Sequence, residues 1–299
     1  MKNEERLRTF LNETVNLNQS RLDHLDSRVT AIMNCLRKDP TLGPLVKTHV
    51  RQGSWAHRTI IKPLPGDEFD ADILLHLTQA KEWSQNPRTY INQVYQAFRR
   101  SATYRDMAEK KNRCVRIHYA NDCHVDVVPY LIRGFFENQK VIINHDDNTF
   151  ERTDPEAFTS WMRRQDHRAN GNLRTTIRLM KYLRDRQDAF SVPSVILTAL
   201  IGGQVSMWWD FWDGYKDLPT TFMRLICSLD SYLQQHDTMP SVADPGRPET
   251  TFNHRWDERR YAHFRAEVHK LAAEVKAAHA ENDQARSVTL WQKIFGPAF

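Results

Sequence analysis

Phe69-Asp70-Ala71-Asp72-Ile73-Leu74-Leu75 is the stretch that decides the fold expected for this chain. Aromatic and branched aliphatic residues around two aspartates are typical of a β-strand. Because successive side chains of a strand point to opposite faces, Asp70 and Asp72 project from the same face. Two carboxylates on one face repel each other, so the pattern favours a bound cation.

Two further segments flank this strand in the sequence. Gly53-Ser54 precedes it, with Thr59 between, and His124-Val125-Asp126-Val127-Val128-Pro129 follows it. Asp126 therefore lies in a second apolar strand. Three converging carboxylates suit Mg²⁺, and a pair of such ions supports in-line phosphoryl transfer. A Gly-Ser turn can donate N–H and hydroxyl groups to phosphates. A structural alternative stays open, in which Asp70 and Asp72 lie on a solvated face and Asp126 caps a turn.

Composition limits the class of protein. The chain has 299 residues, of which 40% are hydrophobic, enough for a core, and its net charge of +5 fits a polyanionic ligand. It has no Cys-x-x-Cys, Walker, Gly-x-Gly-x-x-Gly or His-Glu-x-x-His motif, which argues against zinc-ribbon, P-loop, Rossmann and zincin proteins. No apolar run approaches the roughly 20 residues of a membrane span. With a charged N-terminus, this predicts a cytoplasmic protein that does not bind membranes.

Periodicity predicts an α+β protein of two lobes. Residues 1–154 are expected to form a lobe with a mixed sheet and a long N-terminal helix, and residues 155–299 a helical lobe, with a crevice between them. The predicted helices are a long one from Asn18 or Ser20 to before Pro40, then 89–111, 173–183, 195–201, 222–233 and 257–281, with a loop over 238–251. The predicted strands are 60–61, 69–77, 113–119 and 123–130, the last two joined by a hairpin loop at 120–122.

The pattern Gly53-Ser54-x4-Thr59, Asp70-x-Asp72 and Asp126 resembles the polymerase-β-type nucleotidyltransferase superfamily. Leu179-Met180-Lys181-Tyr182-Leu183, followed by Ser194, is similar to the donor-triphosphate segment of the cGAS/DncV-like nucleotidyltransferases of CBASS antiphage defence. The ending Thr289-Leu290-Trp291-Gln292-Lys293-Ile294-Phe295-Gly296 resembles that of several bacterial members. The resemblance covers nearly the whole chain.

This resemblance implies a polymerase-β-like lobe followed by a helical lobe like that of oligoadenylate synthase. It implies synthesis of a cyclic di- or trinucleotide, with adenine, from NTP substrates, ATP among them. Asp70, Asp72 and Asp126 would bind two Mg²⁺ ions, with Mn²⁺ as an alternative. The nucleotide would contact Gly53, Ser54, Lys181 and Ser194. An operon partner such as a HORMA-type protein would regulate the enzyme.

The chain departs from the family pattern at several positions. Arg58 stands where glycine is usual, and Val195 where some relatives have a base-stacking aromatic. The cysteine spacing has no counterpart of the animal sensor's zinc-binding insertion, so direct activation by DNA is unsupported.

Several interpretations stay open from the residues alone. Arg174, Arg178 and Lys181 share a helix face that is either solvated or binds triphosphate, while Arg184 and Arg186 are expected to be solvated. His124 either orients Asp126 or is merely packed. An aromatic cluster at 208–212 is expected to pack in the core. The function alternatives are another polymerase-β-type enzyme, acting on RNA ends or a small acceptor, and an inactive nucleotide-binding module.

Overall fold

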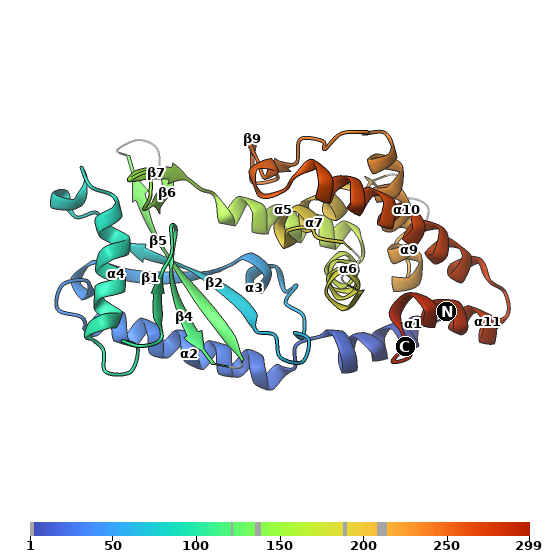
Figure 1. Cartoon of the computed structure of the whole chain (residues 1–299), viewed down its shortest axis with the longest axis horizontal. Coiled ribbons are helices and arrows are strands. Elements are labelled where there is room, and N and C mark those ends of the chain that lie inside the picture. The colour runs from blue at the N-terminus through green and yellow to red at the C-terminus, as the bar shows by residue number, and fades with distance from the viewer. Residues whose placement is uncertain (1–2, 121, 135–138, 188–189, 208–213) are drawn as a thin grey trace. The chain divides into compact units, whose positions relative to one another are not determined.

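A computed structural model describes residues 3–120, 122–134, 139–187, 190–207 and 214–299 (Figure 1). Internal contacts divide the chain into two compact units. The sheet unit comprises residues 17–56 and 63–155, and the helical unit comprises residues 1–16, 57–62 and 156–299. The division into domains 1–154 and 155–299 stays a prediction.

The described residues of the sheet unit form strands, three helices and short 3-10 turns. Its strands are β1 (Val46–Gln52), β2 (Phe69–Leu77), β3 (Ala108–Lys110), β4 (Val115–Tyr119), β5 (Cys123–Arg133), β6 (Gln139–Asn144) and β7 (Thr149–Arg152). Its helical segments are α2 (Gln19–Lys38), η2 (Gly43–Leu45), α3 (Gly53–His57, whose last residue groups with the helical unit), η3 (Lys81–Trp83) and α4 (Arg88–Arg100).

Within the described residues these strands form one mixed sheet. The order is β1-β2-β5-β4-β3, and β6 continues from β5 to β7. β2 runs parallel to β5, while the other neighbouring pairs are antiparallel. The central β2–β5 pair aligns Asp72 with Asp126. The fold therefore brings the predicted carboxylates to one place on the sheet.

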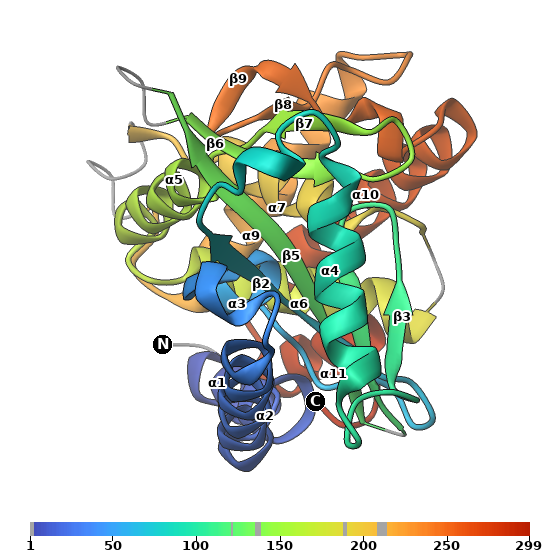
Figure 2. The ribbon, with the colours of Figure 1, turned by 90° about the vertical axis from the view of Figure 1, so that its left-hand side faces the viewer.

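Two helices cover the apolar side of the sheet. Buried residues of α2 recur at three- and four-residue steps, as the sequence predicts, and the Asn18 side chain caps its start by accepting from the Arg21 N–H at 2.9 Å. Helix α4 buries Tyr90, Ile91, Val94, Ala97 and Phe98, and it crosses over β5 in Figure 2. The aspartates occupy the alternate positions of β2 and β5, whose side chains point to the other side of the sheet.

The helical unit is built from α1 (Glu4–Phe10), η1 (Leu11–Val15), α5 (Pro155–Arg168), α6 (Leu173–Gln187), α7 (Ser194–Gly203), α9 (Leu218–Gln234), α10 (Glu258–Ala280) and α11 (Gln284–Phe295). It also contains β8 (Ala243–Asp244), β9 (Arg247–Thr251) and η4 (Asn253–Arg255). One continuous apolar core joins these helices. Helix α10 packs against α9, and Trp291 and Phe295 of α11 are buried in the same core.

Three sequence predictions about local structure need correction, and three strands were missed. Ile61 forms only an isolated bridge with Asn16 and packs on the helical core, so 60–61 is not a strand of the sheet. The helix predicted over 89–111 ends at Arg100, because residues 108–110 pair with β4 instead. The loop predicted over 238–251 contains the β8–β9 hairpin. Strands β1, β6 and β7 were not predicted, because β1 and β7 consist mostly of polar residues and the apolar run of β6 is limited to residues 141–143.

Two other expectations concern segments that are partly or wholly outside the described residues. The aromatic residues Trp208, Trp209, Phe211 and Trp212 lie outside them, as does Asn121 in the predicted hairpin loop. Among the helices that are described, none combines the length and apolar character needed to cross a membrane.

Candidate active site

The predicted carboxylates lie on two neighbouring strands. Asp72 of β2 is directly opposite Asp126 of β5, and Asp70 is opposite His124. The residues that alternate with them, such as Ala71, Ile73 and Val125, are fully buried on the other side of the sheet. The prediction that Asp70 and Asp72 share one face is therefore confirmed, and the register adds Asp126 to that face.

The Gly53-Ser54 turn lies beside this group. β1 pairs with β2 so that Gln52 is opposite Asp72, and Gly53 opens α3 immediately afterwards. Gly53 has φ of 60°, and a Cβ added there would lie 2.5 Å from Oδ2 of Asp72. Any larger residue would meet both the backbone strain and this carboxylate. Glycine is thus favoured here both by the positive φ and by the close approach of the turn to Asp72.

Arg58 has an unusual backbone for its residue type. Its φ is 57°, in the left-handed region that glycine enters without steric cost. A glycine would adopt this conformation without steric cost, and the present chain adopts it with an arginine.

Asp126 is held by an arginine that sequence analysis did not single out. Arg116 of β4 is opposite Asp126 in the register. Its Nε and Nη2 atoms each donate to one Asp126 oxygen at 2.8 Å. These hydrogen bonds raise the pKa of Arg116, so the guanidinium stays charged. The alternation of β4 was the signal that could have placed Arg116 on the carboxylate face.

The donor set fits a hard divalent ion, since it consists of carboxylate oxygens on one sheet face. Among the described residues, however, no three His, Cys, Asp or Glu side chains are gathered closely enough to hold a metal. Asp126 faces Arg116 in this conformation. The chemistry of the residues thus fits Mg²⁺, while their side chains are not preassembled around one point.

His124 contacts a different carboxylate from the one considered in the sequence. Its Nδ1 atom lies 3.8 Å from Oε2 of Glu68, and its ring lies 6.2 Å from that of His118. Neither contact involves Asp126. The interpretation of His124 as a packed residue is therefore favoured over a role in orienting Asp126.

The helical unit holds the predicted Lys181 in a buried position. Only 4% of Lys181 is exposed, and its Nζ atom donates to the carbonyl oxygen of Thr59 at 3.0 Å. Thr59, also buried, belongs to the 57–62 segment that this unit includes. The alternative in which Lys181 lies on a solvated face is therefore excluded, because α6 is packed on almost every side, while its contact with triphosphate stays a prediction.

The other basic residues of α6 are mostly engaged within the helical unit. Arg174 pairs with Asp166 at 3.0 Å, and burial lowers the pKa of Arg178. Arg184 is half-buried and donates from Nη1 to Oγ of Ser194 at 3.0 Å, so its predicted solvation is wrong. Arg186 is exposed, yet it donates to the Phe295 carbonyl at the end of α11.

Ser194 opens α7, as predicted, but its hydroxyl accepts the hydrogen bond from Arg184. Val195 packs against the apolar core. A phosphate contact by Ser194 therefore stays a prediction, and the geometry identifies Arg184 as the residue that orients it.

His57 lies close to the cations of the helical unit. Its ring is buried against Phe158, with ring centroids 4.8 Å apart. Burial, followed by the positive charges of Lys181 and Arg174, lowers the pKa of His57 to about 4. The histidine is thus neutral at physiological pH, and any positive charge here comes from lysine and arginine.

His57→Gln is expected to reduce the decrease in the free energy of unfolding that acidification causes. In the wild type, the His57 pKa is 6.5 in the unfolded chain and about 4 in the folded chain. The unfolded chain therefore binds more protons between these two pH values, and the free energy of unfolding decreases as the pH falls through this window. The shift corresponds to roughly 3 kcal/mol. Urea unfolding at several pH values between 7 and 4 measures it. The exposed His263→Gln variant is the control, and parallel curves for wild type and His57→Gln would contradict the prediction.

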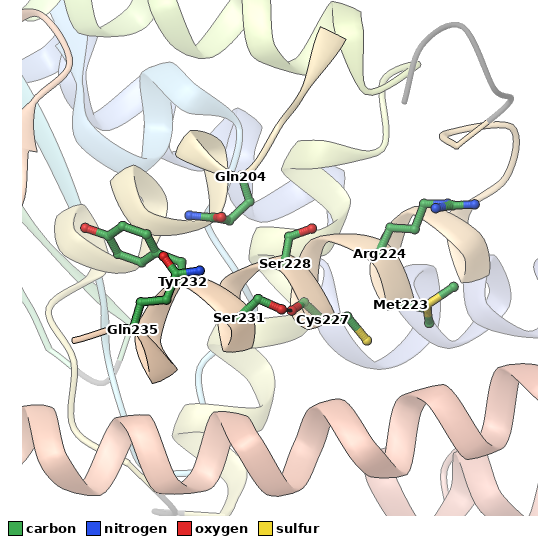
Figure 3. Close-up of a pocket in the computed structure, with 8 residues that line it drawn as sticks. All are labelled: Gln204, Met223, Arg224, Cys227, Ser228, Ser231, Tyr232 and Gln235. Carbon is green, nitrogen blue, oxygen red and sulfur yellow. Dashed lines mark hydrogen bonds between the residues drawn. The ribbon is translucent and has the colours of Figure 1, made fainter. Parts of the chain in front are cut away.

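A separate pocket of about 490 Å³ lies on α9 and the end of α7 (Figure 3). It is lined by Gln204, Met223, Arg224, Cys227, Ser228, Ser231, Tyr232 and Gln235. None of the predicted site residues lines it. The candidate active-site residues are therefore identified by register and chemistry and not by a cavity.

Residues 1–166 match the model of the Second Messenger Oligonucleotide or Dinucleotide Synthetase domain family. The match covers more than half of the chain and includes all three predicted carboxylates. The chain belongs to this family. It is a nucleotidyltransferase with the polymerase-β-like α+β fold, as the sequence predicts.

Similar proteins share nearly the full length. A c-di-GMP synthase of Roseivirga ehrenbergii is 24% identical, over 95% of this chain and 82% of that protein. Vibrio cholerae DncV cyclic AMP-GMP synthase, in complex with the linear intermediate 5′ pppA(3′,5′)pG, matches with a TM-score of 0.76 and 16% identity, over 99% and 96% of the two chains. The Escherichia coli MS115-1 CdnC:HORMA-deltaN complex matches with a TM-score of 0.73 and 17% identity, over 99% and 98%. At these identities the structures establish the fold.

Proposed function

We propose that this chain joins NTPs into a small cyclic oligonucleotide of two or three nucleotides, at least one of them adenosine, for antiphage signalling. The observation that carries the proposal is the register of Asp70, Asp72 and Asp126 on one face of the family's sheet. The Roseivirga relative is named a synthase of a cyclic dinucleotide. The adenosine is supported by the intermediate bound to DncV.

The reaction assigns a role to each candidate residue. A 2′- or 3′-hydroxyl of one nucleotide attacks the α-phosphorus of an NTP, a new O–P bond forms, and the bond to pyrophosphate breaks. Asp126 accepts the hydroxyl proton. Two Mg²⁺ ions at Asp70, Asp72 and Asp126 would lower the pKa of the attacking hydroxyl and neutralise charge on the leaving group. The linear product then becomes a donor through its own triphosphate, and a second attack closes the ring.

The remaining residues would bind the donor nucleotide. Gly53 allows the backbone of the turn to lie against Asp72, and the Ser54 hydroxyl that follows would contact phosphate oxygens. Lys181 would contribute a cation to the donor triphosphate, where its charge counts more because it is buried. Ser194, oriented by Arg184, would donate a hydrogen bond to the same group.

Regulation by a partner protein is part of the proposal. A synthase that is always active would be toxic to its cell, and CdnC has been solved in complex with a HORMA protein. Activity of this chain is therefore expected to rise when proteins encoded beside it are added.

The requirement for an acceptor tests the proposed reaction. The chain is expected to convert NTPs alone, with Mg²⁺ and neighbouring gene products, into a phosphatase-resistant product. An enzyme acting on RNA ends or on a small molecule would instead require that acceptor, and adding tRNA would move the label into it. Nucleotide binding without any turnover would select an inactive binding module.

A further inference from the structure

Arg116 and Asp126 form a two-pronged ion pair at the edge of the proposed metal site, on the side of Asp126 that faces β4. Both guanidinium nitrogens lie 2.8 Å from carboxylate oxygens, one on each oxygen. Their strands β4 and β5 are adjacent and place the two residues opposite each other. A planar guanidinium with two parallel hydrogen bonds is the strongest single partner that a carboxylate finds among side chains.

The pair is largely removed from solvent. The Asp126 side chain is 13% exposed and the Arg116 side chain 27%. The charge of Asp70 also acts on Arg116, so the guanidinium lies within electrostatic reach of two of the three carboxylates. Breaking such a pair without replacing the cation leaves a desolvated charge, which costs more than losing a surface pair.

This cation binds both oxygens of one of the three expected metal ligands. Asp126 cannot give its oxygens fully to a metal while both accept from Arg116. The described residues accordingly show no gathered group of three potential ligands. Arg116 thus competes with a metal ion for Asp126.

We infer that Arg116 is an internal counter-ion that stabilises the metal-free carboxylates and lowers their affinity for the divalent ion. Metal binding requires Arg116 to release at least one Asp126 oxygen. The site therefore switches between an arginine-bound and a metal-bound form. This inference rests on the assignment of Asp70, Asp72 and Asp126 made under the proposed function.

Removing the charge of Arg116 should strengthen metal binding. Its positive charge both repels the incoming ion and must be displaced from Asp126, and both effects disappear in Arg116→Gln. Removing a nearby unit charge in a partly buried site changes the affinity for a cation by about tenfold or more. The dissociation constant for Mn²⁺ alone is therefore expected to fall about tenfold.

Arg113 offers a matched control in the same unit. It forms the same two-pronged pair with Glu151, at 2.7 and 2.8 Å, and neither residue is opposite one of the three aspartates in the register. Arg113→Gln removes an equal charge from an equal geometry. It is expected to leave Mn²⁺ affinity unchanged.

The experiment measures free Mn²⁺ by electron paramagnetic resonance during titration of the full chain without nucleotide. The melting temperature in EDTA and in saturating Mn²⁺ is the second readout. Arg116→Gln should bind Mn²⁺ about tenfold more tightly than wild type, melt lower in EDTA and gain more on adding Mn²⁺. Equal or weaker binding by Arg116→Gln would overturn the inference.

Two further variants separate the causes. Arg116→Lys keeps the charge but loses the two-pronged geometry. Its affinity for Mn²⁺ should be within about threefold of the wild-type affinity. An affinity as high as that of Arg116→Gln would contradict an effect of charge. Asp72→Asn should lose Mn²⁺ binding. If it binds as well as wild type, or if wild type does not bind, the assignment of the triad fails, and with it this inference. If Asp72→Asn loses Mn²⁺ binding but Arg116→Gln binds Mn²⁺ with the same affinity as wild type, the assignment of the triad stands and only the inference about Arg116 is wrong.

Discussion

Asp72→Asn is expected to lower the rate of nucleotidyl transfer by roughly 10³-fold or more, which is about 4 kcal/mol of transition-state stabilisation. Asp72 lies between Asp70 on its own strand and Asp126 on the neighbouring one. Losing its charge would remove the central one of the three expected metal ligands. Residues that act as one unit are not additive, so the Asp70→Asn and Asp72→Asn double variant should be hardly slower than Asp72→Asn.

Asp67→Asn is the matched control for this prediction. Asp67 is exposed and lies three residues before Asp70. We expect Asp67→Asn to cause little loss of the rate of nucleotidyl transfer. The Asp72→Asn protein is expected to stay folded, because the change removes repulsion between carboxylates, and circular dichroism checks this. Substantial turnover by Asp72→Asn with Mg²⁺ or Mn²⁺ would contradict the assignment.

Lys181→Ala is expected to weaken binding of ATP by about 10- to 150-fold, which corresponds to roughly 1.5–3 kcal/mol for a charge-assisted hydrogen bond. Lys181 is 4% exposed, so its charge is poorly screened by solvent. Isothermal titration with ATP, under conditions that prevent turnover, measures the loss directly.

The buried position of Lys181 requires two checks. Its removal also deletes the hydrogen bond to the Thr59 carbonyl, so a lower melting temperature is expected alongside weaker binding. Arg164→Ala removes one positive charge from an exposed position of α5 and should change ATP affinity little. Equal losses in the two variants would indicate a diffuse positive field and contradict a specific contact by Lys181.

The carboxylate face could be predicted from the sequence because the strand period is short and strict. Alternation within 69–75 fixes the shared face of Asp70 and Asp72 without knowledge of any partner strand. The capped helix α2 could be predicted for a similar reason, since Asn18 and the three- and four-residue apolar spacing are local signals. These features depend on neighbours only a few residues away.

Other features depend on contacts that no local pattern carries. Residues 3–16 pack with helices more than 150 positions later, as shown by the contact of Phe10 with Tyr182 and Phe295. The burial of Lys181 follows from the segment that contains Thr59, which is 122 positions away. Arg116 becomes part of the site only through the register of β4 with β5. Sequence spacing indicates what a residue is able to do, whereas its partner is set by the fold.

The mass of the product tests the central claim most directly. The chain is incubated with all four NTPs, Mg²⁺ and its neighbouring gene products, then treated with phosphatase and examined by mass spectrometry. The account predicts a phosphatase-resistant species whose mass equals two or three NMP residues less one water for each, with at least one AMP, and absent from Asp72→Asn. A ladder of long linear products, or labelling only of an added tRNA, would contradict it.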